Sequence, residues 1–93
     1  MIIQHEEADT KGSFYIEDGD SRVAELTYSK RGSHKIIIDH TEVTEQLRKK
    51  GVGKQLVMAA VEYARENDLK ILPLCSFTKS VFEKVDEIRD VLS

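Results

Sequence analysis

The first 43 residues show the alternation of apolar and polar positions that is typical of β-strands separated by turns. Ala24, Leu26 and Tyr28 form the more apolar face of their segment, so we expect this face to meet the core. The Asp-Gly pair at 18–19 favours a tight hairpin, and the three isoleucines at 36–38 are typical of a central strand covered on both faces. The predicted strands, arranged as an antiparallel meander, are 2–6, 13–17, 22–29 and 34–43.

From Val52 onward the apolar positions recur with the spacing of a helix, which we expect to end at 67–68. The run 70–75, with the sequence KILPLC, is a short apolar strand in which Pro73 favours an edge, a bulge or a splayed pairing. A helix between strands 34–43 and 70–75 forms a β-α-β crossover, which favours parallel pairing of the two strands. The expected fold class is therefore α/β, with a mixed sheet and packed helices.

The last part of the chain predicts a second helix over about 78–85. Ser76 or Thr78 is a suitable residue to cap its N-terminus, because both carry a side-chain hydroxyl. Residues 86–93 either add one more turn or remain loose. With no linker or repeat in the sequence, we expect one domain over 1–93.

The composition narrows the class of protein. An apolar share of 40% and a charged share of 33% are ordinary for a globular chain, and the net charge of −3 argues against nucleic acid as the main partner. We predict no membrane partner, because the sequence has no apolar run of bilayer length and no signal-peptide pattern. Cys75 is the single cysteine, so we expect no internal disulfide and a cytoplasmic setting. His5 and His34 lack the spacing of metal ligands, and we predict no metal site.

A glycine motif stands at the junction between the meander and the long helix. Gly51 and Gly53 let the main chain turn tightly and leave its N–H groups uncovered, and three cations precede them at 48–50. The first N–H groups of a helix have no partner inside the helix, and the helix dipole adds partial positive charge there. The junction is therefore suited to a phosphorylated ligand.

Two well-known phosphate-binding motifs do not fit this junction. A Walker loop requires a glycine at Arg48 and a serine or threonine at Gln55. A dinucleotide fingerprint requires glycine or alanine at Leu56 and a position after the first strand of the chain. The remaining pattern is Arg-x-x-Gly-x-Gly between a strand and a helix.

This pattern resembles the acyl-CoA-binding signature of the GNAT superfamily of N-acetyltransferases. The segments 39–43, 48–57, 63–75 and 82–85 are similar to the small, shortened members of that superfamily. The resemblance implies a GNAT-like mixed sheet and acetyl-CoA as cosubstrate, with loop amides on the pyrophosphate and the end of the preceding strand along the pantetheine. The residues that it assigns to acetyl-CoA are Thr41, Glu42, Val43, Arg48, Lys49, Lys50, Gly51, Val52, Gly53 and Lys54.

The resemblance implies transfer of an acetyl group to an amine acceptor that the sequence does not name. The chain departs from the family where Phe82 replaces a tyrosine that protonates the leaving thiolate, and where Val85-Asp86 replaces a Gly-Phe pair. It also lacks the initial helical pair and the last strands of full-length members. Two alternatives stay open: a CoA-binding or partner-binding module without turnover, and a binder of another phosphorylated ligand.

Cys75 and His40 are the candidate catalytic residues. Cys75 ends a strand predicted to run parallel to the CoA-binding strand, so its thiol is placed to accept an acetyl group, and a helix starting directly after it favours the thiolate. His40, on the neighbouring strand, is the candidate base. Alternatively, Cys75 is a small apolar residue of the core and His40 an exposed residue, and Asp39 or Glu42 acts as the base for an amine.

Overall fold

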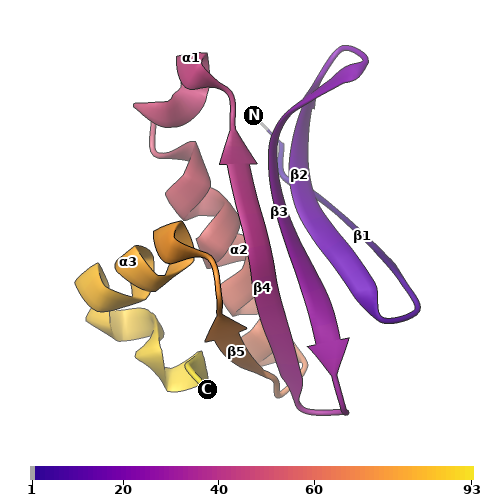
Figure 1. Cartoon of the computed structure of the whole chain (residues 1–93), viewed down its shortest axis with the longest axis vertical. Helices are drawn as coiled ribbons and strands as arrows, with labels where there is room; N and C mark the ends of the chain where they lie inside the picture. Colours follow the sequence, from indigo (N-terminus) through magenta and orange to yellow (C-terminus); the bar gives the residue numbers. More distant parts are fainter. Residues whose placement is uncertain (1) are drawn as a thin grey trace.

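The computed structural model describes residues 2–93, and residue 1 of the predicted domain lies outside the described residues. The chain forms one five-stranded sheet with its helices packed against it (Figure 1). Its elements are β1 (Gln4–Ala8), β2 (Lys11–Asp18), β3 (Ser21–Arg31), β4 (Lys35–Val43), α1 (Glu45–Arg48), α2 (Val52–Glu66), β5 (Lys70–Pro73), α3 (Ser76–Lys84) and the 3₁₀ helix η1 (Asp86–Val91).

The strands follow one another across the sheet in the order of the sequence. The pairs from β1 to β4 are antiparallel, as the meander predicted, and β5 pairs in parallel with β4 after the crossover through α2. This arrangement confirms the predicted α/β fold with a mixed sheet.

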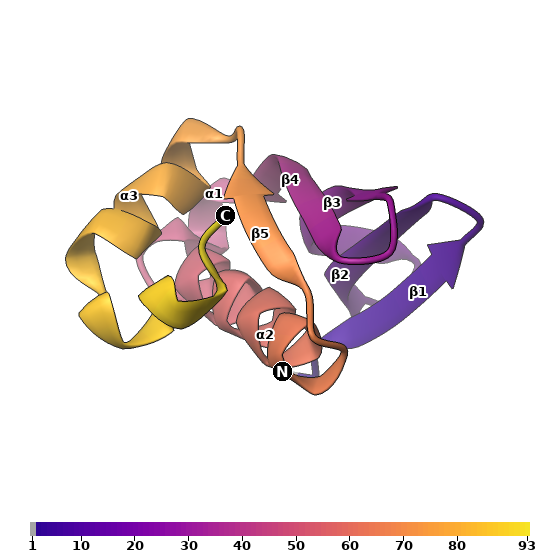
Figure 2. The same cartoon turned by 90° about the horizontal axis from the view of Figure 1, so that it is seen from below.

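The core lies between one face of the sheet and α2 (Figure 2). Ala24, Leu26 and Tyr28 are buried on this face, which confirms the prediction from their alternation. Helix α2 contributes a buried stripe at helical spacing, formed by Val52, Leu56, Val57, Ala60, Val61 and Ala64. Each fully buried aliphatic side chain of this kind stabilises the fold by roughly 1.5–3 kcal/mol.

Strand β4 is central in the sheet, and its three isoleucines are all buried. Ile36 and Ile38 belong to the core, whereas Ile37 lies on the opposite face and outside the core cluster. Burial of all three confirms the prediction of a central strand covered on both faces. The second face of the sheet carries polar side chains, and there the Arg22 guanidinium lies 3.7 Å from the ring centre of Tyr15.

The C-terminal segment takes the first of the two forms that the sequence left open, an added helical turn. Residues 86–91 form η1, which places Ile88 and Val91 in the core instead of leaving the segment loose. The main chain of Ser93 then donates a hydrogen bond of 2.8 Å to the carbonyl of Ile71, so the end of the chain lies along the free edge of β5 (Figure 2). None of the helices in 2–93 has the length and apolar character needed to cross a membrane.

Other differences concern the ends of elements. Strand β1 runs from Gln4 to Ala8 instead of 2–6, and the short helix α1 was not predicted. Helix α3 begins at Ser76, with Cys75 as its N-cap residue, so neither Ser76 nor Thr78 caps it. Thr78 is instead fully buried, because the earlier start of the helix turns its side chain towards β4.

Candidate functional site

Strands β4 and β5 separate halfway along β4. They pair only as far as Ile38 and Pro73, and the last bond runs from the N–H of Leu74 to the carbonyl of Ile38 at 3.1 Å. Pro73 brings no N–H to the pairing, and the chain then turns away into α3. A β-bulge at Asp39 bends β4 at the same level, since Thr27 pairs with His40 and Tyr28 with Ile38.

The separation leaves the main chain at 39–43 without a strand partner on the β5 side, among the residues that the structure describes. A strand with free N–H and C=O groups is a site at which an extended ligand adds to a sheet. A groove of about 800 Å³ opens beside the end of this strand, between β4, the start of α2 and α3. Thr41, Val43, Gly53, Phe77 and Val81 are among its lining residues. This volume is within the usual range for small-molecule sites.

The start of α2 forms one end of the groove. Gly51 is its N-cap residue, with φ +73° and ψ 17°, a left-handed conformation that suits glycine. Gly51 is exposed and no side chain caps α2, so no side-chain cap bond occupies the first N–H groups of this helix. Gly53 is buried, and the ring of Phe77 lies so close that a Cβ at this position would be 2.8 Å from Cζ.

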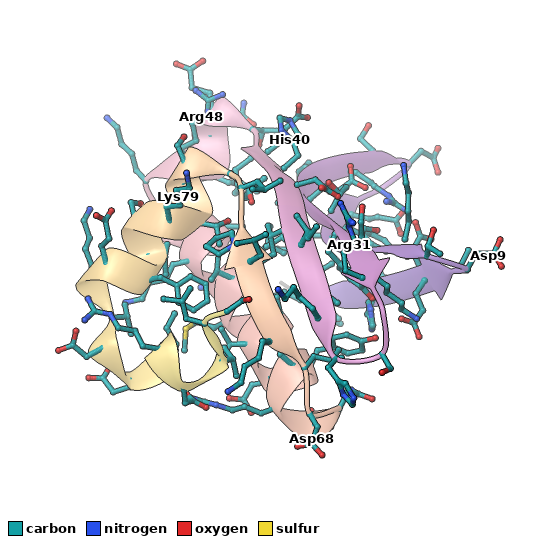
Figure 3. The ribbon with its side chains drawn as sticks, turned by 60° about the horizontal axis from the view of Figure 1, so that its bottom comes forward. Asp9, Arg31, His40, Arg48, Asp68 and Lys79 are labelled. Atoms are coloured by element: carbon teal, nitrogen blue, oxygen red, sulfur yellow. The ribbon has the colours of Figure 1, made fainter. Side chains whose placement is uncertain are left out.

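Positive side chains surround this end of the groove. Arg48 Nε donates a hydrogen bond of 3.0 Å to the carbonyl of Val43, which ties the guanidinium to the end of β4. Arg48 and Lys54 line the groove, whereas Lys49 and Lys50 are exposed outside its lining. Figure 3 shows Arg48, Lys79 and His40 at the opposite end of the molecule from Asp68. Cations thus gather at the α2 end of the groove, whose lining also includes Glu25 and Glu42.

The structure brings most of the expected cofactor residues together. The lining includes Thr41, Glu42, Val43, Arg48, Gly51, Gly53 and Lys54. The side chain of Val52 is buried in the core, so only its main chain is available to a ligand. The sequence reasoning missed a face of α3 that closes the groove, formed by Phe77, Ser80, Val81 and Lys84. A predicted helix start at 76 would have placed these four residues on one face, because they recur at helical spacing.

Cys75 is half-buried beside this groove, at the N-terminus of α3. Burial raises the pKa of its thiol, but the N–H of Thr78, the hydroxyl of Thr41 and the N–H of Phe77 favour the thiolate more strongly. The pKa therefore lies below the ordinary value for cysteine. Such a thiol is more reactive as a nucleophile at neutral pH than an unperturbed one.

His40 lies on the other face of β4. It pairs with Thr27, whereas Thr41, which contacts Cys75, pairs with the core residue Leu26. Its Nε2 lies 2.7 Å from Oε1 of Glu42, and this hydrogen bond raises the pKa of the imidazole. Within 2–93, no hydrogen bond joins His40 to Cys75. The role of His40 as a base stays a prediction.

Comparison with known proteins identifies the family of the chain. A family model described as GCN5-related N-acetyl-transferase matches residues 13–91. A GCN5-like protein from Staphylococcus aureus, solved by NMR, is 44% identical, with 97% of this chain and 87% of that chain covered and a TM-score of 0.75. None of the curated proteins compared gives a match.

More distant structures share the fold alone. The ribosomal-protein-S18-alanine N-acetyltransferase of Escherichia coli is 8% identical, with 84% of this chain and 53% of that chain covered and a TM-score of 0.68. An aminoglycoside N-acetyltransferase crystallised with CoA is 18% identical, with 83% of this chain and 67% of that chain covered and a TM-score of 0.63. The fold, the family match and the identity to the staphylococcal protein agree: this chain belongs to the family of GCN5-related N-acetyltransferases.

Proposed function

We propose that this protein binds acetyl-CoA in the groove beside β4 and transfers the acetyl group to an amine through Cys75. One observation carries the proposal. The unpaired end of β4 leads from the open N-terminus of α2 to the vicinity of Cys75. Acetyl-CoA carries a pyrophosphate, then a pantetheine arm, then a thioester. In the same order, the groove offers the start of α2, the unpaired strand and the thiol of Cys75.

The charges of the groove support a CoA ligand. Arg48 and Lys54 stand beside the main-chain N–H groups at the start of α2, and Lys84 lines the groove from α3. This lining complements the phosphates of CoA. The aminoglycoside enzyme that shares the fold was crystallised with CoA, which is consistent with the same use of the fold here.

The chemistry proposed for Cys75 is thioester exchange. Its thiolate attacks the acetyl carbonyl, a bond forms between Sγ and the acetyl carbon, and the bond from that carbon to the CoA sulfur breaks. CoA leaves as a thiolate and takes a proton from solvent. An incoming neutral amine then displaces Sγ, giving the amide and a free thiol after loss of the amine's proton. His40 stays the candidate base. Because such a free thiol requires a reducing compartment, we propose a cytoplasmic setting.

A second function is CoA binding without turnover. Phe82, which stands where the resemblance expects a proton-donating tyrosine, is 3% exposed and packs in the core. It neither lines the groove nor carries a hydroxyl. If Cys75 does not accept the acetyl group, the chain therefore has no residue at position 82 that could protonate the leaving thiolate. It then acts as a CoA-binding module.

Intact-mass measurement after incubation with acetyl-CoA tests the proposal. We expect the wild-type protein to gain one acetyl group that hydroxylamine removes, and the Cys75→Ser variant to gain no such labile group. Transfer from the acetylated protein to members of a panel of amines would complete the reaction. Binding without acetylation of Cys75 or of any amine would contradict transfer and favour the module.

Amide chemical shifts test the location of the ligand separately. Acetyl-CoA and desulfo-CoA should both perturb residues 41–54, because both carry the pyrophosphate and the pantetheine arm. ATP is the control, since it carries phosphates but no pantetheine and should leave the amides at 41–43 unchanged. Perturbation centred elsewhere would contradict the proposed groove.

A further inference from the structure

Strand β1 is the outer strand of the sheet (Figure 1). It pairs with β2 on one side and, among the described residues, with no strand on the other. All five of its residues are exposed, so β1 adds no buried side chain to the core. A segment with few buried contacts opens more easily than the rest of a fold. The attachment of β1 therefore depends strongly on the partners of its side chains.

The carboxylate of Glu7 is the point at which β1 meets the other elements. Its Oε2 accepts hydrogen bonds from the hydroxyls of Tyr28, at 3.0 Å, and Tyr63, at 2.9 Å. Nζ of Lys30 lies 3.1 Å from the same oxygen. Tyr28 and Lys30 belong to β3, and Tyr63 belongs to α2. One oxygen thus joins β1 to a strand that is not its neighbour and to the long helix.

A glycine in β2 lets Tyr28 reach this carboxylate. Glu7 pairs with Gly12, and Gly12 pairs with Tyr28, so the three residues form one row across three strands. A Cβ at Gly12 would lie 2.3 Å from the hydroxyl oxygen of Tyr28. The tyrosine therefore occupies the place that a side chain of β2 would take, and it contacts β1 directly.

His5 joins the same cluster, two residues before Glu7 on the same face of β1. Its ring is stacked on that of Phe14 at 4.1 Å between centres, and its Nε2 lies 2.6 Å from the hydroxyl oxygen of Tyr28. A tyrosine hydroxyl carries one proton, and Tyr28 donates it to Glu7. Nε2 of His5 is therefore the donor to Tyr28, and Nδ1 is the nitrogen that takes up a proton in acid.

We propose that β1 is a strap that opens separately from the rest of the fold, that Glu7 is its latch, and that acid releases it. The proposal goes beyond the function given above and does not depend on it. Protonation of Glu7 removes the charge that strengthens all three interactions, so one proton weakens the whole attachment. Opening would uncover the ring of Phe14, which is 5% exposed in the closed fold, and would make β2 the edge strand.

The surroundings of Glu7 support release in this direction. The charged and titratable groups that face it are Tyr28 and Lys30 from β3, Tyr63 from α2 and His5 from β1, whereas the β2 residue opposite it is Gly12.

Hydrogen bonds from Tyr63, Lys30 and Tyr28 lower the pKa of Glu7, and burial lowers the pKa of His5. Both groups therefore bind protons more readily once β1 is open, and a fall in pH shifts the equilibrium towards opening.

Amide hydrogen exchange of the free protein, resolved by residue with NMR, tests this inference. Protection factors are compared from about pH 7 to about pH 4, because they already correct for the intrinsic effect of pH on exchange. We expect the β1 amides that bond to β2 to be less protected than Ile36 and Ile38 of β4. Their protection should fall by about tenfold or more over this range, and faster than that of β4.

Glu7→Gln keeps the size of the side chain without its charge, and Tyr28→Phe keeps the ring without its hydroxyl. Both should lower the protection of β1 at about pH 7 by roughly tenfold, and more than they lower that of β4. Glu6→Gln is the matched control, because this carboxylate lies next in the chain, points to the opposite face and bonds to Arg22 at 2.7 Å. It should keep the wild-type dependence of β1 on pH, whereas Glu7→Gln should flatten it below about pH 5.

Equal protection of β1 and β4 at every pH would overturn the proposal, because β1 would then open only with the whole fold. Unchanged protection of β1 in Glu7→Gln, or an equal effect of Glu6→Gln, would overturn the role of Glu7 as the latch. If Tyr28→Phe does not fold, the two glutamine variants decide.

Discussion

The ring of Phe77 lies directly against the Cα of Gly53, where an added Cβ would be 2.8 Å from Cζ. This contact joins α3 to the start of α2, and both residues line the groove. Phe77 is 40% exposed, so its ring has room to move away from the helix. The groove thus depends on the absence of a side chain at position 53.

Gly53→Ala should weaken binding of acetyl-CoA more than it weakens the fold. The new methyl group must displace the Phe77 ring, because that ring supplies its nearest neighbours and also lines the groove. We expect at least a tenfold higher Kd by calorimetry, which corresponds to about 1.4 kcal/mol. The double variant Gly53→Ala/Phe77→Ala is the matched control and should bind better than Gly53→Ala alone. Equal affinity of Gly53→Ala and wild type would contradict the role of this contact.

Gly51→Ala should lower stability through the main chain alone. A Cβ at this position meets no atom within 4 Å, but the φ of +73° is unfavourable for alanine by roughly 1–2 kcal/mol. For a domain of this size, each kcal/mol lowers Tm by about 4–8 °C. Gly51→Asn is the control. Asparagine tolerates this conformation better than alanine does, so the Tm of this variant should fall less. A thermal melt of Gly51→Ala identical to wild type would contradict the strained conformation.

Gly12→Ala should be strongly destabilising. The Tyr28 ring crosses β2 at this glycine, and a Cβ there would be 2.3 Å from Cζ and from the hydroxyl oxygen. The crossing lets the Tyr28 hydroxyl reach Oε2 of Glu7 at 3.0 Å and Nε2 of His5 at 2.6 Å. Overpacking of this kind costs about 1–3 kcal/mol, which chemical denaturation measures.

Lys11→Ala provides the comparison for that variant, because position 11 is an exposed neighbour on the same strand. It should leave the free energy of unfolding nearly unchanged. Comparable losses in Lys11→Ala and Gly12→Ala would show that β2 tolerates change poorly in general, and that the tyrosine crossing is not the cause.

Acidification should loosen the attachment of β1 in two steps. Burial lowers the pKa of His5 below its ordinary value of about 6.5, and hydrogen bonds from Tyr63, Lys30 and Tyr28 lower the pKa of Glu7 below its ordinary value of about 4.5. For both groups the unfolded chain binds protons more readily than the folded one, so each contribution to stability is complete above those values and falls as pH decreases. The free energy of unfolding, measured by chemical denaturation at each pH, should therefore fall first below about pH 6.5 and again below about pH 4.5.

His5→Gln should remove the contribution of His5 and Glu7→Gln that of Glu7, because neither amide titrates in this range. Part of the loss in acid remains in Glu7→Gln, since Arg22 and Arg65 also hold the pKa of the Glu6 and Asp90 carboxyls below the ordinary values. The two variants serve as controls for each other. A stability that stays constant from pH 7 to pH 5 in the wild type would contradict the first step.

Much of the fold follows from local pattern. The alternation of Ala24, Leu26 and Tyr28 identified the buried face of β3, and the apolar spacing after Val52 identified α2. Pro73 correctly indicated the separation of two strands, because a missing N–H is a local property that the sequence states directly. The same reasoning located the groove beside the glycine motif.

The details that escaped prediction depend on distant contacts. The bulge at Asp39 arises from the pairing of β3 with β4, and it decides which face His40 and Thr41 occupy. A shift by one residue reverses every face in a strand, so the side of His40 was not readable from the sequence. The start of α3 at Ser76 likewise accompanies a contact between Thr78 and Thr41, two residues far apart in the chain.

The divergence of β4 from β5 affects the dynamics of the protein without bound acetyl-CoA. Among the described residues, no strand pairs with 39–43 on the side of β5. Hydrogen exchange at these positions should be fast in the free protein and slow markedly when acetyl-CoA occupies the gap, while Ile36 and Ile38 exchange slowly in both states. The cosubstrate would then act as the missing neighbour of the sheet, and its departure would return one half of a central strand to solvent.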